Sequence, residues 1–329
     1  MRYRDVGTSG LRLSEIGLGC GSPTFAGRVD DATAAAIIAR AYELGITYFD
    51  TGETYAEGRS EELLGAALKS RRGEVVIATK FAKDRSVGPS EKPGARRSVM
   101  RAVEGSLRRL QTDYIDLYVM HEPDPATPID ETLRTLDDLV RAGTIRYAAC
   151  AGFATWQFCD AMWTARHHGY ATFISSGVRY NLLDRRAESE MAPFCADRGF
   201  GVVPTAPLAS GLLTGKYQSG TATATPSRFN TIPPFAGEEH RDIERFGRLL
   251  TPGKLATVDA LHAFAVERGH TVAELAINWL LAQPWLSSVP IGVTSVEQLE
   301  RNVAGLGWDL SAEDLAALDD ITPPRSQTH

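Results

Sequence analysis

The feature that most constrains the fold is an alternation that runs along nearly the whole chain. Short apolar runs rich in Ile, Val and Tyr are each followed by a longer segment with the apolar spacing of a helix. This alternation is typical of strand–helix units repeated around a parallel sheet. Eight of the runs predict strands, at Glu15–Gly19, Thr47–Asp50, Val75–Lys80, Tyr114–Met120, Arg146–Cys150, Phe173–Val178, Gly201–Pro204 and Ser288–Ile291.

Helical spacing fills most of the segments between the predicted strands and follows the last one. No linker or change of composition divides the chain. Eight such strand–helix units favour an α/β fold, a closed (β/α)8 TIM barrel, over an open doubly wound sheet, with a single domain over residues 1–329. The helices are predicted at Ala32–Leu44, Arg59–Ser70, Ala95–Leu110, Ile129–Ala142, Thr155–His168, Arg186–Arg198, Pro252–Gln283 with a break near Gly269, and Val296–Ala304.

Three segments account for the excess over the roughly 250 residues of a plain barrel. Met1–Ser14 predicts a β-hairpin that closes the amino-terminal end of the barrel. Ser311–His329 predicts a carboxy-terminal helical extension. Tyr217–Gly247 is rich in Thr, Pro and Gly and follows the seventh strand, so we expect it to form a lid.

Composition narrows the class of partner. The chain has 329 residues, of which 43% are hydrophobic, so it can bury a large core and is not intrinsically disordered. Its formal net charge is −6 and its arginine pairs are scattered along the sequence. Nucleic acid and anionic membrane are therefore not expected as partners. The sequence leaves open whether the protein is a monomer or a homo-oligomer.

The amino terminus and the cysteines indicate a cytoplasmic protein. The opening MRYRDVGTSG lacks the apolar core of a secretory signal. The uncharged stretch Leu275–Val296 contains two prolines, so it predicts a helix, a turn and a buried strand rather than a membrane span. No metal site is expected, because no metal-ligand spacing is present. The cysteines are interpreted as thiols in a reducing compartment: Cys20, Cys150, Cys159 and Cys195.

Ionisable residues stand where three consecutive predicted strands end. Asp50 closes the second strand, Lys80 closes the third, and His121 follows the fourth. The carboxyl ends of barrel strands surround one mouth, so these side chains are expected to converge there. Tyr55 follows Asp50 closely enough to reach the same place. Each residue alone could be structural, but the four together favour a catalytic role.

These residue types suit proton transfer to and from a substrate oxygen. Asp50 and Lys80 can neutralise each other, and the Lys80 cation is expected to lower the pKa of Tyr55 from about 10 toward working pH. Tyr55 would then donate and accept a proton. His121 would hydrogen-bond the same substrate oxygen and orient it.

The settings of these four residues resemble the catalytic tetrad of the aldo-keto reductases. They are FDTGETYAEGRSEELLG, VVIATKFA and DLYVMHEPDP. The likeness extends to GLGCG, RYNLLDRR, PLASGLLTGKY and GVTSVEQLERN, and so covers nearly the whole chain. It implies a (β/α)8 barrel that transfers hydride between a nicotinamide cofactor and a carbonyl-bearing small molecule. It also implies that Tyr55 is the general acid, that Lys80 and Asp50 tune it, and that His121 positions the carbonyl.

The resemblance implies a site for NADP(H) or NAD(H). Thr294 stands where many NADP(H)-dependent members carry Arg or Lys, and a neutral hydroxyl offers no charged fork to a 2'-phosphate, which leaves the choice between the two cofactors open. The residues at the family's pyrophosphate and adenosine positions are Gly211, Leu212, Thr214, Lys216, Gly292, Ser295, Gln298 and Asn302.

The chain departs from the family pattern where the nicotinamide is held. A Ser-Asn pair after strand five, a Gln on strand six and a Tyr on strand seven are usual there. This chain has Ala151, Gly152, Gly177 and Thr205 at those positions, and Ala206 where Ser is common. These substitutions remove three polar anchors and a stacking face from the ring.

Three functions therefore stay open. The first is oxidation or reduction of a carbonyl compound with a nicotinamide cofactor. The second is a redox-neutral lyase, dehydratase or isomerase that uses the tetrad for proton chemistry without hydride transfer. The third is a binding protein without catalysis, as the family's ion-channel partner subunits suggest, although the intact tetrad argues against it.

Overall fold

The computed structural model describes residues 1–21, 29–83, 91–217 and 251–324. The predicted lid, Tyr217–Gly247, lies outside these residues except for Tyr217 itself. The chain divides into two compact units, so the single domain expected from the sequence stays a prediction. Unit 1 comprises Met1–Val178, Glu190–Thr205 and Trp285–Glu300, and unit 2 comprises Arg179–Ser189, Ala206–Pro284 and Arg301–His329.

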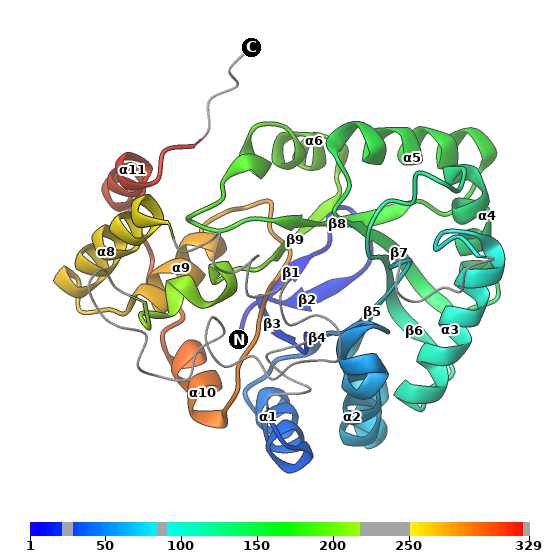
Figure 1. Ribbon diagram of the computed structural model, residues 1–329, viewed down its shortest axis with the longest axis horizontal. Helices are drawn as coiled ribbons and strands as arrows, with labels where there is room; N and C mark the ends of the chain where they lie inside the picture. The colour runs from blue at the N-terminus through cyan, green and yellow to red at the C-terminus, as the bar shows by residue number, and fades with distance from the viewer. Residues whose placement is uncertain (22–28, 84–90, 218–250, 325–329) are drawn as a thin grey trace. The chain divides into compact units, whose positions relative to one another are not determined.

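Unit 1 contains the predicted barrel. Eight strands form one sheet in the order β10-β3-β4-β5-β6-β7-β8-β9, and every register given for neighbouring strands is parallel (Figure 1). A parallel bridge between Val202 and Leu286 brings β9 beside the segment that enters β10, which closes the barrel. The strands are β3 (Ile16–Gly19), β4 (Tyr48–Asp50), β5 (Val76–Phe81), β6 (Ile115–Met120), β7 (Ile145–Ala151), β8 (Phe173–Arg179), β9 (Gly201–Thr205) and β10 (Val289–Ile291).

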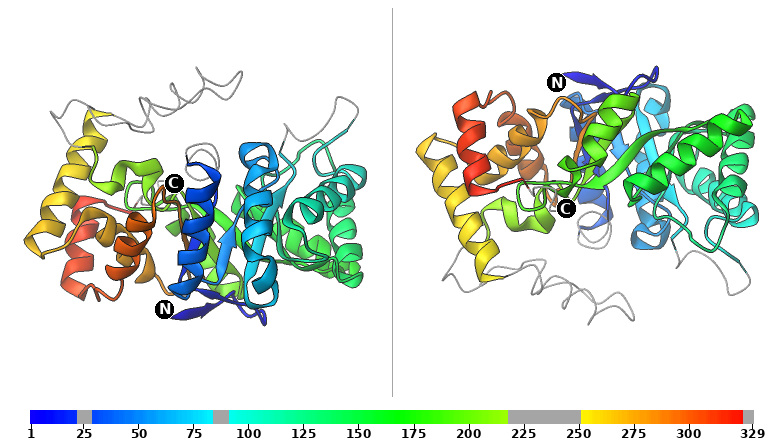
Figure 2. Two further views of the ribbon diagram at one scale, coloured as in Figure 1. Left: turned by 90° about the horizontal axis from the view of Figure 1, so that it is seen from below. Right: turned by 90° about the horizontal axis from the view of Figure 1, so that it is seen from above.

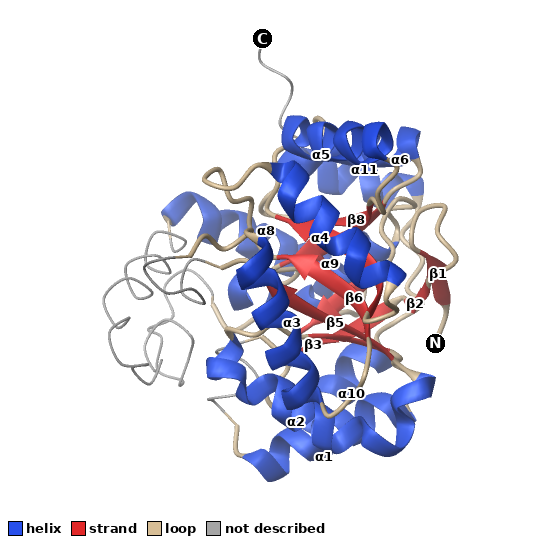
Figure 3. Cartoon of the chain, turned by 90° about the vertical axis from the view of Figure 1, so that its right-hand side faces the viewer, coloured by secondary structure: helices blue, strands red, loops and turns tan. Residues whose placement is uncertain are grey.

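Helices surround these strands on the outside (Figure 3). Their apolar faces are buried against the sheet, as in α1, where Ala34, Ile37, Ile38 and Ala41 are buried. The helices of unit 1 are α1 (Asp31–Glu43), α2 (Arg59–Leu68), α3 (Arg96–Leu110), α4 (Ile129–Arg141), α5 (Thr155–His168) and α6 (Met191–Arg198), together with the start of α10 (Val296–Ala304).

One helix prediction is wrong in its extent. The segment Arg186–Arg198 forms a short 3-10 turn, η4 (Arg186–Glu188), and then α6, rather than one continuous helix. Pro193 lies in the first turn of α6. Proline has no N–H to donate to the carbonyl four residues earlier, and its ring crowds the preceding turn. A helix can therefore begin just before Pro193, but it cannot continue into Pro193 from a turn that starts at Arg186.

The amino-terminal hairpin closes the barrel end opposite the predicted mouth. Strands β1 (Tyr3–Asp5) and β2 (Arg12–Ser14) pair antiparallel and lie across one end of the barrel (Figure 2). Val6 and Leu13 are fully buried in the barrel's central apolar cluster. Gly7 has φ of +56°, and a Cβ there would lie 2.2 Å from the carbonyl oxygen of Gly199, so the close approach of the turn to the start of β9 requires glycine.

The strands are apolar on both faces, because one face lines the barrel interior and the other meets the helices. The interior cluster includes Tyr48, Leu117, Val119, Ala149 and Val203. The outer layer contains an aromatic cluster between α5, α6 and the sheet, formed by Phe158, Phe173, Phe194 and Phe200. These two layers hold the strand ends, and hence the mouth, in a fixed arrangement.

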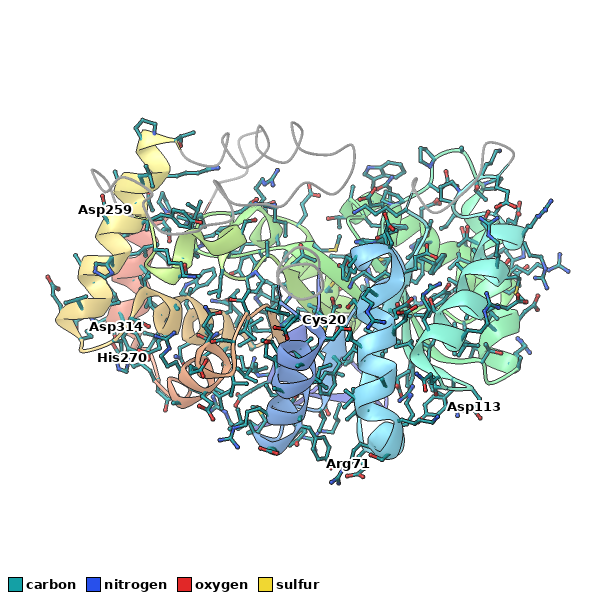
Figure 4. All side chains as sticks on the ribbon, turned by 60° about the horizontal axis from the view of Figure 1, so that its bottom comes forward. Cys20, Arg71, Asp113, Asp259, His270 and Asp314 are labelled. Carbon is teal, nitrogen blue, oxygen red and sulfur yellow. The ribbon has the colours of Figure 1, made fainter. Side chains whose placement is uncertain are left out.

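The described residues of unit 2 are mainly helical. Gly269, with φ of +77°, separates α8 (Pro252–Glu267) from α9 (Val272–Leu281), which confirms the predicted break. Arg185 is nearly buried and joins distant parts of this unit, since it bonds Glu188, Asp319 and the carbonyl oxygen of Thr322. The other elements are η4, η5 (Ala209–Thr214) and α11 (Ala312–Ile321), and Asp314 of α11 is labelled in Figure 4.

No helix among the residues that the structure describes is long and apolar enough to cross a bilayer. The stretch Leu275–Val296, the candidate considered from the sequence, forms the end of α9, a turn and β10.

The close packing of α2 against α3 gives a test of the fold. A Cβ on Gly65 would lie 2.5 Å from the backbone carbon of Leu110, so we expect Gly65→Ala to lower the free energy of unfolding by about 1–3 kcal/mol despite the better helix propensity of alanine. Gly73→Ala is the matched control, since nothing lies within 4 Å of its Cβ position. Denaturant titration of both variants measures the difference, and equal stabilities would contradict the packing.

Candidate active site

The predicted catalytic residues come together at the carboxyl end of the barrel strands in unit 1. Asp50 is the last residue of β4, Lys80 precedes the last residue of β5, and His121 directly follows β6. These three strands are adjacent and parallel. The β4–α2 loop carries Tyr55 at the start of the short turn η1 (Tyr55–Gly58).

A buried ion pair occupies the centre of the site. Lys80 Nζ lies 2.5 Å from Asp50 Oδ1, with side-chain exposures of 6% and 16%. Lys80 also donates to the carbonyl oxygen of Thr51 at 2.7 Å and to the hydroxyl of Tyr55. All three ammonium protons therefore have an acceptor, which makes burial of this charge tolerable.

Tyr55 lies between this ion pair and His121. Lys80 Nζ is 4.8 Å from the centre of the Tyr55 ring, and the rings of Tyr55 and His121 meet edge to face with centres 5.7 Å apart. A phenol hydroxyl and an imidazole are thus held within reach of one small reacting group. The contact between all four residues agrees with the convergence expected from the sequence.

The expectation that the pKa of Tyr55 falls from about 10 toward working pH is wrong, although Lys80 acts in the expected direction. Burial raises the pKa of Tyr55 above 10; Lys80 lowers it, but Asp50 raises it again. The sequence argument counted the cation and not the loss of water around the phenol. Burial alone would also lower the pKa of Lys80, but Asp50 and Tyr55 raise it above its usual value, so the charge persists. Tyr55 is accordingly a protonated donor beside a permanent cation.

His121 is held neutral. Burial and the nearby charges of Lys80 and Lys83 lower its pKa to about 2. Its Nδ1 atom is buried and has no hydrogen-bond partner among the residues that the structure describes. A buried polar atom without a partner is costly, and at the mouth of a barrel it is an available contact for a ligand.

Several residues that support the site were not identified from the sequence. The hydroxyl of Tyr48 donates to Asp50 Oδ2 at 3.3 Å, and Tyr48 stands two residues earlier on the same face of β4, a spacing that could have indicated it. Ser60 donates to the carbonyl oxygen of Cys20 at 2.8 Å and shares a hydrogen bond with Thr51. Cys20, labelled in Figure 4, is buried, and burial raises its thiol pKa, so it is not a nucleophile.

The residues predicted to contact the cofactor are divided between the two units, so their assembly into one site stays a prediction. In unit 1, Ser295 Oγ accepts the Gln298 N–H, and the Gln298 side chain accepts from Thr294. Asn302 follows one turn later in α10, in the part of this helix that belongs to unit 2. In unit 2, the η5 segment has left-handed backbone at Gly211 and a Thr214 hydroxyl bonded to the Gly211 carbonyl. The remaining positions are Gly292 in unit 1 and Leu212 and Lys216 in unit 2.

Small residues stand opposite each other where β7 ends and near the end of β8. Ala151 and Gly177 are opposite each other in the parallel register, and a Cβ on Gly177 would lie 2.9 Å from that of Ala151. Gly152 has φ of +69°, and its N–H donates to the carbonyl oxygen of Gly177 at 3.0 Å. We call these three positions the bare patch (Ala151, Gly152 and Gly177), because together they carry one methyl group as side chain. Thr205, at the end of β9, is exposed and Ala206 follows it.

The described residues contain no group of three His, Cys, Asp or Glu side chains that could hold a metal ion. The four cysteines are free, as expected, and all but Cys159 are buried.

The fold and the tetrad geometry agree with the comparison to known proteins. A model of the aldo/keto reductase family matches residues 15–323. The chain therefore belongs to the aldo/keto reductase family.

Proteins that are similar to this chain in sequence carry different functional names. An uncharacterized oxidoreductase, YrpG of Bacillus subtilis, is 35% identical over 336 residues, covering 98% of this chain and 96% of that protein. A versiconal hemiacetal acetate reductase of Aspergillus parasiticus is 32% identical over 352 residues, covering 99% and 98%. A probable voltage-gated potassium channel subunit beta of rice (Oryza sativa subsp. japonica) is 34% identical over 310 residues, covering 93% and 91%.

The lowered pKa of His121 predicts how stability depends on pH. Unfolded histidine titrates near 6.5, whereas folded His121 does not bind a proton until far lower pH, so its contribution is fully present above pH 6.5 and is lost as the pH falls. Between pH 7 and 5 this group should remove about 2 kcal/mol of unfolding free energy. His121→Gln should flatten the dependence measured by denaturant titration, and an unchanged slope would contradict the assignment.

Proposed function

We propose that the protein is an NAD(P)H-dependent oxidoreductase that reduces the carbonyl group of a small molecule, or oxidises the corresponding alcohol. The observation that carries this proposal is the hydrogen-bonded arrangement of Tyr55, Lys80 and Asp50 facing a neutral His121. Membership in a family of aldo/keto reductases, and relatives named as reductases, support it.

In this mechanism Tyr55 is the general acid. Its raised pKa keeps the proton on the phenol at neutral pH, and its hydrogen bond to Lys80 stabilises the phenolate that forms when the proton passes to the substrate oxygen. Asp50 and the Thr51 carbonyl hold Lys80 at Tyr55. The neutral imidazole of His121 orients the substrate oxygen by a hydrogen bond without competing for the proton.

The residues at the mouth of the barrel are suited to a nicotinamide cofactor only in part. When bound, the nicotinamide supplies or accepts the hydride. The bare patch offers the carboxamide no side-chain donor, and the Gly152 N–H is already used by Gly177. We propose that binding energy comes mainly from the residues at the pyrophosphate and adenosine positions. Because Thr294 offers no charge to the 2'-phosphate of NADPH, we expect no strong preference for NADPH over NADH.

The redox-neutral lyase, dehydratase or isomerase considered from the sequence is not favoured, because no observation on the site requires it and the named relatives include reductases. The potassium channel relatives are named as subunits, and an intact tetrad here supports catalysis rather than binding alone. A small-molecule partner and a cytoplasmic location stay predictions.

Replacement of the proposed acid tests the function. Tyr55→Phe should lower kcat for carbonyl reduction by about 10²–10⁴-fold, measured as loss of nicotinamide absorbance with a panel of aldehydes and ketones. Tyr118→Phe is the matched control: its hydroxyl is also buried, lies on neighbouring β6 and has no hydrogen-bond partner among the described residues, so activity should be unchanged. Wild-type turnover that does not consume NADPH or NADH would contradict the proposal.

The bare patch gives a second test. Ala151→Ser with Gly152→Asn should tighten NADPH and NADH binding by about 3–10-fold, as expected for one or two added hydrogen bonds. Asparagine tolerates the positive φ of residue 152, so the fold should persist. Titration of the cofactor against the fluorescence of the five tryptophans measures the affinity. Unchanged affinity would show that these positions do not face the carboxamide.

A further inference from the structure

Two tryptophans are exposed on the outer face of α5. Trp156 is 70% and Trp163 is 53% exposed, which makes them the most exposed tryptophans among the described residues. Tryptophan carries the largest apolar surface of any side chain and is enriched at protein interfaces. Two such rings on one helix therefore need an explanation that the barrel and its site do not provide.

The two rings lie on one continuous stripe. The side chains of Trp156, Asp160, Trp163 and His167 recur at intervals of four, three and four residues, which places them on one face of a helix. All four are exposed. We call this set the outer stripe. The opposite face of α5, with Phe158, Ala161, Met162 and Ala165, is buried against unit 1 and anchors the helix.

The outer stripe of one copy is complementary to the outer stripe of a second copy that runs in the opposite direction. Asp160 and His167 lie three residues before and four residues after Trp163. In an antiparallel pair of α5 helices centred near Trp163, each Asp160 therefore faces His167 of the second copy. Trp156, seven residues before the centre, then lies toward the carboxy-terminal end of the second α5, where Tyr170 follows the helix. Such self-complementarity is what a two-fold symmetric interface requires.

The charges around the stripe agree with this arrangement. The carboxy-terminal half of α5 is basic, with Arg166, His167 and His168, while Asp160 is the acidic residue of the helix. The Arg166 guanidinium lies 5.5 Å from the centre of the Trp163 ring, and His168 stacks on Tyr170 with centres 5.2 Å apart. Antiparallel pairing brings each basic end to the acidic residue of the other copy, whereas parallel pairing would set like charges side by side.

We propose that the outer stripe of α5 is the contact surface of a two-fold symmetric homodimer, in which the α5 helices of two copies pack antiparallel. Each Trp163 packs against its counterpart at the two-fold axis. Asp160 of each copy hydrogen-bonds His167 of the other, and Trp156 covers Tyr170. The catalytic residues do not take part, so the proposal is independent of the reaction.

The area sets the strength of this contact. A whole tryptophan side chain has a surface of about 200 Å². The exposed fractions of Trp156 and Trp163 therefore correspond to about 250 Å² of exposed indole surface in one copy, and about 500 Å² in two copies. Stable interfaces bury about 1,200–2,000 Å². The other residues of the stripe and Tyr170 add to the indoles, which places the dimer in the weak, transient class.

Sedimentation velocity of the full chain over a concentration series tests the proposal. The wild-type protein should show a monomer–dimer equilibrium, and Trp163→Lys, which sets two like charges at the two-fold axis, should weaken dimerisation by at least about 10-fold. Val266→Lys is the control, because Val266 is 56% exposed on α8 and outside the stripe, so this variant should dimerise like the wild type. Circular dichroism of each variant confirms that it is folded.

A charge exchange tests the antiparallel geometry. Asp160→Lys and His167→Asp should each weaken the dimer, because each sets like or unmatched groups face to face, and the double variant should restore it. A wild-type protein that is monomeric throughout the series, a dimer that Trp163→Lys leaves intact, or a double variant no better than the single ones would overturn the proposal.

Discussion

The ion pair between Lys80 and Asp50 is the interaction on which the site depends. A lysine at 5% exposure survives as a cation only with a counter-charge and a full set of acceptors, and removing one partner of such a pair typically costs about 3–5 kcal/mol. The barrel supplies the partners because the ends of two adjacent parallel strands cannot move apart without breaking the sheet. The pair in turn fixes the place at which the phenol of Tyr55 meets a positive charge.

The loop that carries Tyr55 leads from β4 into α2 and has a strained backbone. Ala56, Glu57 and Gly58 all have positive φ, and the two residues with a Cβ each cost on the order of 1 kcal/mol in this conformation. The neighbouring Ser60 and the fully buried Glu61 anchor the far end of the turn, the latter through hydrogen bonds with Thr79 and Arg109. The anchors keep the phenol in place although its own backbone prefers other conformations.

Sequence patterns predicted the strands to within a residue or two, because short runs rich in Ile, Val and Tyr alternate with longer segments of helical spacing, which is typical of a parallel sheet. They also predicted that Asp50, Lys80 and His121 meet, since barrel strands end at one mouth. The pKa of Tyr55 was not accessible in this way, because desolvation depends on which atoms surround the phenol in space. Pro193 indicates a helix start near α6, but the apolar spacing on both sides of it is that of one continuous helix, so the spacing alone does not predict the break.

The bare patch also constrains how this protein can change. Gly177 and Ala151 face each other so closely that their β-carbons would be 2.9 Å apart. A side chain at position 177 therefore requires residue 151 to be glycine or the two strands to separate locally. Polar groups can be added at positions 151 and 152 while Gly177 is kept, so an evolutionary or engineered path toward a tighter cofactor grip begins at β7.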